Sequence, residues 1–191
     1  MEELQTLFDA GDSEGLAARG TELFRSGNEQ AAFEYYRLAS KLGNAVAMGN
    51  LGYCYQMGRG VKADNRLAAY CFERASELDE PNSMLKMGDF FFRGKGGLPK
   101  DCRRSVEYYL RAYEIVASSS EPDEALLAKI CYRLGICKKD GFGTERDYEA
   151  AYEYFQAAAE AVTTNSDYRD VQAEKLLQKV QSAMAECETH F

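Results

Sequence analysis

The chain of 191 residues has no tryptophan and a single histidine, His190, which is the next-to-last residue. A Ser–His–Asp or Cys–His catalytic site needs a histidine that is held firmly beside its nucleophile. We expect the last residues to be frayed and His190 to be unsuited to that role. The chain is therefore predicted not to be an enzyme. Paired catalytic carboxylates stay open as an alternative, although no two acidic residues stand out.

Long apolar runs are also missing, and none approaches the roughly 20 residues that cross a membrane. The opening residues MEELQTLFDAGD lack the basic region and apolar core of a secretory signal. The net charge is −8, and an acidic surface repels phosphate backbones and anionic membranes. We therefore expect no nucleic-acid partner, no membrane partner and a cytoplasmic location. Because no C-x-x-C pair and no D-x-D-x-D-G loop occurs, we also expect no metal and no cofactor.

Glycine, by contrast, follows a repeating pattern. A triplet of glycines occurs three times, with 36 residues between the first and second copies and 47 between the second and third. An aspartate follows each triplet, at Asp64, Asp101 and Asp147. The triplets are Gly52, Gly58 and Gly60; Gly88, Gly94 and Gly96; and Gly135, Gly141 and Gly143. A period of about 20–50 residues is typical of a solenoid of stacked repeats.

The copy at residues 51–75 predicts a helix, a glycine turn and a second helix. Gly52 leaves a bare spot where we expect another backbone to come close. Gly58 and Gly60 end the first helix, since glycine accepts the left-handed conformation of a helix stop. Asp64 can then cap the free N–H groups of the second helix.

These residues resemble the Sel1-like repeat (SLR) family, whose members are close relatives of tetratricopeptide repeats. The first copy matches the family pattern at Ala47, Leu51, Gly52, Tyr55, Gly58, Gly60, Val61, Asp64, Ala68 and Ala75. The third copy departs from it at Lys138, where the family has tyrosine, and this departure bears on how its two helices pair. The resemblance implies an all-α, right-handed α-α superhelical solenoid of stacked helix hairpins. It also implies a scaffold or adaptor that holds other proteins.

We predict one repeat domain over residues 1–191. Its parts are an N-terminal cap (1–12), a tetratricopeptide-like unit (13–43), repeats at 44–79, 80–121 and 122–163, and a C-terminal capping helix (164–191). The expected helices are 2–10, 13–26, 29–42, 44–57, 64–78, 81–92, 101–117, 122–140, 147–162 and 168–187. The segment SSSEP at 118–122 lengthens the spacing of the repeats. It is either a loop between longer helices or a ridge that contacts a partner.

The six cysteines are irregularly spaced, and several replace apolar residues on the expected helices. An even number of cysteines can form disulfides in a secreted chain. Cys54 and Cys137 occupy the same position of two repeats, but the second repeat has Phe90 there. We interpret the cysteines as reduced, mostly buried thiols of a cytoplasmic protein, with disulfides as the alternative.

In related repeats the inward-facing positions lie three residues before the first-helix glycine and one, four and five after it. Carried over to this chain, that rule places aromatic and apolar anchors and a few charges on a concave wall. The predicted partner-binding residues are Phe24, Tyr53, Met57, Leu85, Phe92, Arg93, Tyr132, Ile136 and Lys139. Side chains of these kinds suit peptide capture, because each can bury area in a pocket while charges set orientation. The plainer alternative is that some of them pack between repeats.

Two hypotheses of function follow. The first is a scaffold or adaptor that captures a peptide or helix of a partner protein on its concave surface. The second is a self-assembling structural or regulatory subunit that uses an end helix or an outer ridge. The sequence leaves the oligomeric state open.

Overall fold

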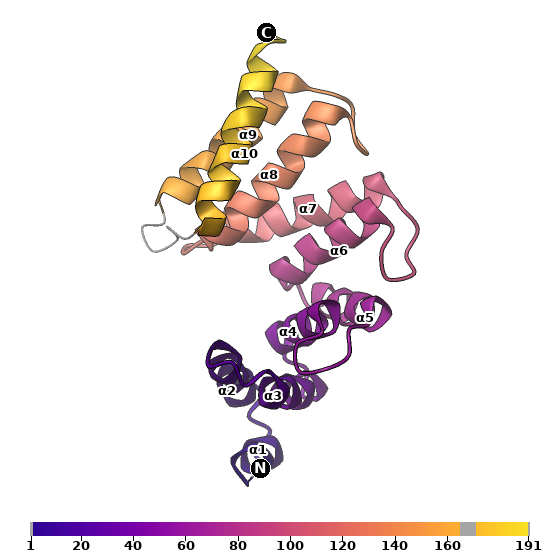
Figure 1. Cartoon of the computed structure of the whole chain (residues 1–191), viewed down its shortest axis with the longest axis vertical. Helices are drawn as coiled ribbons and strands as arrows, with labels where there is room; N and C mark the ends of the chain where they lie inside the picture. Colours follow the sequence, from indigo (N-terminus) through magenta and orange to yellow (C-terminus); the bar gives the residue numbers. More distant parts are fainter. Residues whose placement is uncertain (1, 165–170, 191) are drawn as a thin grey trace. The chain divides into compact units, whose positions relative to one another are not determined.

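The computed structural model describes residues 2–164 and 171–190, which form ten α-helices and no strand (Figure 1). The helices are α1 (Glu2–Asp9), α2 (Ser13–Arg25), α3 (Glu29–Lys41), α4 (Ala45–Met57), α5 (Asn65–Ser76), α6 (Pro81–Arg93), α7 (Cys102–Ala117), α8 (Glu124–Asp140), α9 (Tyr148–Thr164) and α10 (Val171–Glu188). The predicted helices are confirmed, with ends that differ by about two residues, which is the usual uncertainty of helix boundaries. The predicted start of the last helix at 168 lies outside the described residues.

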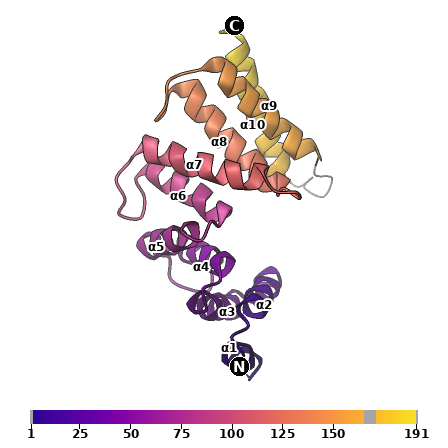
Figure 2. The ribbon, with the colours of Figure 1, turned by 180° about the vertical axis from the view of Figure 1, so that it is seen from behind.

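The chain divides into two compact units, Met1–Lys100 and Asp101–Phe191. In the first unit, α2 packs on α3 and α4 packs on α5, and the contacts of α3 with α4 and of α5 with α6 join successive hairpins (Figure 2). In the second unit, α8 packs on α7 and α9, and α10 packs on α9. The boundary falls inside the predicted repeat 80–121, and the single repeat domain stays a prediction.

The helices begin where a side chain can accept hydrogen bonds from their free N–H groups. Asp64 accepts from the backbone N–H groups of Arg66 and Leu67 at 2.8 and 3.1 Å. Asp101 accepts in the same way at α7, and Asp147 does so before α9. The predicted capping role of Asp64 is confirmed, and its counterparts in the two later repeats cap in the same way.

The first helices α2, α4 and α8 each carry a glycine that makes room for an aromatic ring of the second helix. A Cβ added to Gly52 would lie 2.8 Å from the ring of Phe72, which is too close for two carbon atoms. Gly20 stands in the same way against Tyr36, and Gly135 against Phe155, with Cβ distances of 2.8 and 2.5 Å. The sequence predicted that a backbone would approach Gly52. The three atoms nearest to an added Cβ are instead side-chain atoms of Phe72 and Cys71, and the ring of Phe72 lies on the bare helix surface.

The glycine turn after the first helix has two separate tasks. Gly58, with φ of 70°, ends α4 in the left-handed conformation, and the following N–H of Arg59 donates to the Cys54 carbonyl at 3.0 Å. Gly60 instead faces the preceding hairpin, where an added Cβ would lie 2.2 Å from the backbone oxygen of Glu29.

The second task recurs with the same partner position each time. An added Cβ on Gly96 would lie 2.6 Å from the oxygen of Asn65, and one on Gly143 would lie 2.1 Å from that of Cys102. Glu29, Asn65 and Cys102 are the first residues of α3, α5 and α7. The turn of each repeat therefore touches the start of the preceding second helix, and only glycine leaves room for that contact.

Lys138, which stands in place of the family's tyrosine, does not disturb the pairing of its helices. Its carbonyl accepts the N–H of Asp147 at 2.9 Å, just as the carbonyl of Tyr55 accepts the N–H of Asp64 at 2.9 Å. The bond uses the backbone alone, and a change of side chain leaves it in place.

The longer spacing around SSSEP comes mainly from longer helices. The α7 helix has 16 residues where α5 has 12, and α8 has 17 where α6 has 13. Residues 118–121 between them are exposed. This agrees with a loop between longer helices, and contact of that loop with a partner stays a prediction.

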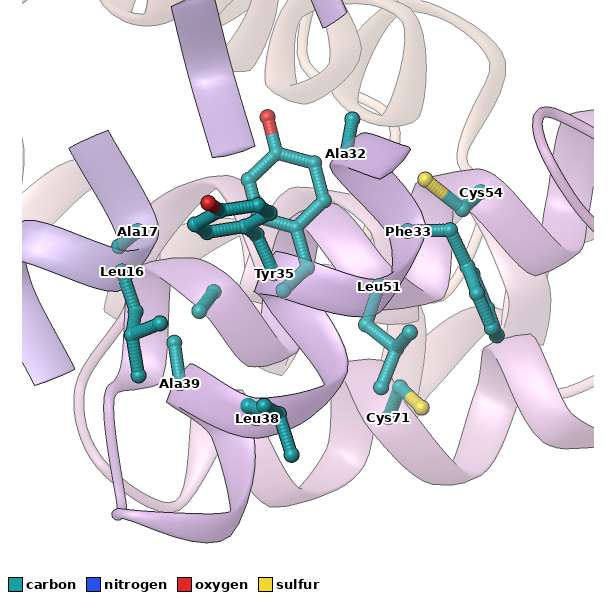
Figure 3. Packing of buried hydrophobic residues seen from close by; sticks show 12 residues of the cluster. Leu16, Ala17, Ala32, Phe33, Tyr35, Leu38, Ala39, Leu51, Cys54 and Cys71 are labelled. Carbon is teal, nitrogen blue, oxygen red and sulfur yellow. The ribbon is translucent and has the colours of Figure 1, made fainter. Parts of the chain in front are cut away.

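The core of the first unit joins α2, α3, α4 and α5 (Figure 3). Small side chains such as Ala32 and Ala39 let the helices approach, and in Figure 3 Tyr35 lies between the residues of α2 and those of α4 and α5. The apolar side chains of α1, which are Leu4, Leu7 and Phe8, pack against this cluster. The first helix therefore packs on the core through its apolar side chains.

Gly58 and Gly60 allow a matched test of the two tasks of the turn. Alanine at either position must adopt the left-handed conformation, which costs about 1–2 kcal/mol of unfolding free energy. Around Gly58 the nearest atom to an added Cβ is 3.4 Å away, whereas Gly60 would meet Glu29. We expect Gly60→Ala to cost roughly 1–3 kcal/mol more than Gly58→Ala in urea unfolding followed by circular dichroism. Equal costs would contradict the contact between hairpins.

The contact of Gly52 with Phe72 predicts a non-additive pair. Gly52→Ala pushes a methyl group into the ring and should cost about 1–3 kcal/mol. In a Phe72→Leu background the smaller side chain makes room for the methyl group. Gly52→Ala should therefore cost at least about 1 kcal/mol less in the Phe72→Leu background than in the parent chain. The comparison is a double-mutant cycle measured by urea unfolding. Strict additivity would show that the ring and the glycine do not constrain each other.

Candidate protein-binding surface

Three side chains from the first helices of successive hairpins contact one another in the first unit. Phe24 of α2 and Tyr53 of α4 meet edge to face, with ring centroids 6.0 Å apart and an interplanar angle of 73°. The ammonium group of Lys86 in α6 lies 6.0 Å from the centroid of the Tyr53 ring. Both arrangements are favourable, because the edge of a ring and a cation are attracted to the face of a π-system.

Other predicted residues of this unit differ in their exposure. Met57, one turn after Tyr53, is 51% exposed, and Arg93 at the end of α6 is exposed as well. Phe92 is half-buried. Leu85 is only 5% exposed and is a core residue, so we leave it out of the candidate surface.

The family's rule did not predict Lys86, because this residue follows Leu85 and is not one of the four inward-facing positions of the repeat. A helical signal for it was present: Lys86, Asp89 and Arg93 are spaced i, i+3 and i+7, which puts them on one side of α6. We name the surface formed by Phe24, Tyr53, Met57, Lys86 and Arg93 the first-helix face.

The predicted binding residues of the third repeat contact other residues of the second unit. Lys139 is ion-paired with Glu186 of α10 at 2.5 Å and with Asp140 at 3.3 Å, and its side chain is 16% exposed. The hydrogen bond with Glu186 is the main reason why the pKa of Lys139 is raised.

Tyr132 lies 6.0 Å from the ring of Phe155, and both Tyr132 and Ile136 pack against a buried cluster of α8, α9 and α10. The terminal helix thus contributes to the packing of these positions. The candidate surface described above lies in the first unit.

The sequence predicted that the single histidine lies in a frayed end, but in the structure its ring contacts another ring. The ring of His190 stacks on that of Tyr148, with centroids 4.0 Å apart and an interplanar angle of 11°. Within residues 2–164 and 171–190, no group of three His, Cys, Asp or Glu side chains could hold a metal ion. No helix of that part of the chain is long and apolar enough to cross a membrane.

Five of the six cysteines are buried, Cys102 is partly exposed, and none of the six forms a disulfide. Burial in the apolar core raises the pKa of Cys54 and of Cys71 to about 11, and that of Cys131 to about 12. These thiols therefore stay protonated near neutral pH and behave as small apolar core residues.

A family model described as the Sel1 repeat matches residues 16–44, 45–80, 81–114 and 128–161. The chain belongs to the Sel1 repeat family. The match at 16–44 covers most of the predicted tetratricopeptide-like unit, 13–43.

Among curated proteins, chitin synthase regulatory factor 3 of Schizosaccharomyces pombe is 27% identical over 161 residues, which are 83% of this chain and 15% of that protein. The ERAD-associated E3 ubiquitin-protein ligase component HRD3A of Arabidopsis thaliana is 35% identical over 71 residues, 37% of this chain and 10% of that protein. This chain of Sel1 repeats thus spans a small part of the length of these relatives.

Two solved structures resemble the fold. A Sel1 repeat protein from Oxalobacter formigenes is 26% identical, with a TM-score of 0.68 over 93% of this chain and 74% of that one. A protective antigen of uropathogenic Escherichia coli with an SLR fold is 22% identical, with a TM-score of 0.66 over 98% of this chain and 43% of that one. The predicted all-α solenoid of helix hairpins is confirmed.

The raised pKa values predict slow alkylation of the core thiols. At pH 8 the thiolate fractions of Cys54, Cys71 and Cys131 should be about 100-fold or more below that of an unfolded cysteine. We expect iodoacetamide followed by peptide mass spectrometry to modify Cys102 first, and all six cysteines once guanidinium unfolds the chain. The free energy of unfolding should also fall as the pH rises from about 9 towards 11, since unfolded thiols lose their protons first.

Modification of Cys54 or Cys131 ahead of Cys102 in the folded chain would contradict this assignment.

Proposed function

We propose that this Sel1 repeat chain is a protein-binding scaffold or adaptor, and that its first-helix face captures a peptide or helix of a partner protein. The observation that carries the proposal is the row of contacts from Phe24 through Tyr53 to Lys86. These side chains come from three helices, and Tyr53 lies against both of the others. A partner that binds them therefore finds the aromatic anchors already ordered.

The chemistry of the face suits a peptide ligand. Tyr53 offers a large, partly buried ring, and the exposed, flexible side chain of Met57 can adapt to an apolar group. Lys86 and Arg93, together with Asp89 on the same side of α6, add charges that set the orientation of the ligand.

The relatives support a role in assembly. By their names, one is a regulatory factor of chitin synthase and another is a component of an E3 ubiquitin ligase. In this proposal the chain has no catalytic role of its own, and its partner is another protein. The free thiols support a reducing, cytoplasmic setting.

Substitutions on the face test the proposal. We expect Tyr53→Ala and Met57→Glu each to weaken an identified partner about tenfold or more, because both alter the centre of the surface. Partners are first captured from a lysate by the tagged full chain and identified by mass spectrometry. Their affinities are then measured with purified components by calorimetry. Leu67→Ala, at an exposed apolar residue of α5, is the matched control and should change the affinity less than twofold.

Folding of every variant is checked by urea unfolding, and Met57→Glu, at an exposed position, keeps the test valid if Tyr53→Ala is unstable. Unchanged affinity of both folded variants would overturn the proposal. The mass in solution is measured alongside, because a stable dimer that buries the first-helix face would favour self-assembly instead.

A further inference from the structure

A hollow lies in the first unit, and its lining shares no residue with the first-helix face. Its volume is about 400 Å³, at the small end of the range for ligand pockets. It lies where α3 ends and α4 begins, with α5 on its other side. The lining residues are Ser40, Lys41, Gly43, Met48, Leu51, Tyr70, Cys71 and Arg74.

The hollow has an apolar interior and an aromatic side. Leu51 and Cys71 are buried members of the core cluster, and Met48 of α4 lies beside them in the lining. Tyr70 is 61% exposed, which is unusual for a ring of this size. Leu42, which lies between the lining residues Lys41 and Gly43 in sequence, is exposed as well. An apolar side chain entering the hollow would cover Met48 and Tyr70.

The charges of the lining are of one sign. Lys41 and Arg74 contribute two cations, and the lining has no carboxylate, although the chain has a net charge of −8. Arg74 is ion-paired with Glu77 outside the lining, and both side chains are more than half exposed. A guanidinium group has five N–H donors, which leaves donors for a second carboxylate.

The carbonyl end of α3 opposes an anion here, but more weakly. A helix C-terminus acts like about half a negative charge, and only near its last turn. The full positive charge of Lys41 outweighs it, and Arg74 adds hydrogen-bond donors although Glu77 balances its charge. The local charge therefore favours an acidic group.

We propose that this hollow binds a peptide segment of a partner protein in which an acidic residue stands beside a large apolar residue. The carboxylate pairs with Lys41 and Arg74, and the apolar side chain lies against Met48 and Tyr70. The small volume limits the contact to one or two side chains. The hollow thus adds a second contact point, independent of the first-helix face.

The test uses a defined probe and the full chain labelled with nitrogen-15. An acetylated, amidated four-residue peptide of alternating aspartate and leucine is titrated while amide resonances are recorded. We expect the shifts to centre on Gly43, Met48 and Tyr70, and the asparagine analogue of the peptide to bind at least fivefold more weakly. Lys41→Gln and Arg74→Gln should each weaken binding of the aspartate peptide about threefold or more. Added sodium chloride should weaken this binding to a similar degree.

Two controls separate this site from other effects. Lys62→Gln removes an exposed lysine outside the lining and should leave binding unchanged. Tyr53→Ala should also leave it unchanged, because that residue belongs to the first-helix face. The proposal is overturned if millimolar peptide causes no shifts at the hollow, if the asparagine analogue binds equally well, or if the two glutamine variants bind like the parent.

Discussion

The rest of the structure depends on a contact between two stretches of backbone. The second glycine of each turn lies against the first residue of the preceding second helix, as Gly60 does against Glu29. A side chain at that glycine would overlap the backbone oxygen, so the contact allows no other residue without movement. It aligns one hairpin with the next, while the first glycine of the turn ends the helix and the aspartate starts the following one. The row from Phe24 to Lys86 rests on this alignment.

Much of the fold could be predicted because its signals are local. A glycine that ends a helix and an aspartate that caps the next one act on residues within a few positions, and their spacing set the helix bounds well. The partner of Gly52 could not be predicted in the same way. A bare position shows that something comes close, but Phe72 lies 20 residues away in sequence, and only the packing of the two helices brings its ring there.

The candidate surface was predicted less completely, because exposure depends on neighbours that the repeat pattern does not contain. Leu85 and Met57 were both placed by offset from a glycine, yet Leu85 is in the core and Met57 is open. Lys139 was placed by the same rule, but Glu186 of the terminal helix pairs with it. Lys86 was missed for a related reason, since its place is set by the ring of Tyr53 on another helix.

The α4 helix explains how the first unit can present two different surfaces. It contains no charged residue, and apolar or polar neutral side chains surround its axis. Ala47, Leu51 and Cys54 enter the core, Tyr53 and Met57 belong to the first-helix face, and Met48 lines the hollow. The charges beside these surfaces come from other helices: Lys86 from α6, Lys41 from α3 and Arg74 from α5. The apolar part of both surfaces therefore comes from α4, which is packed in the core. The charged part comes from exposed residues of the helices around it. Under the two proposals, partner preference can change at those exposed positions while the packing of α4 stays as it is.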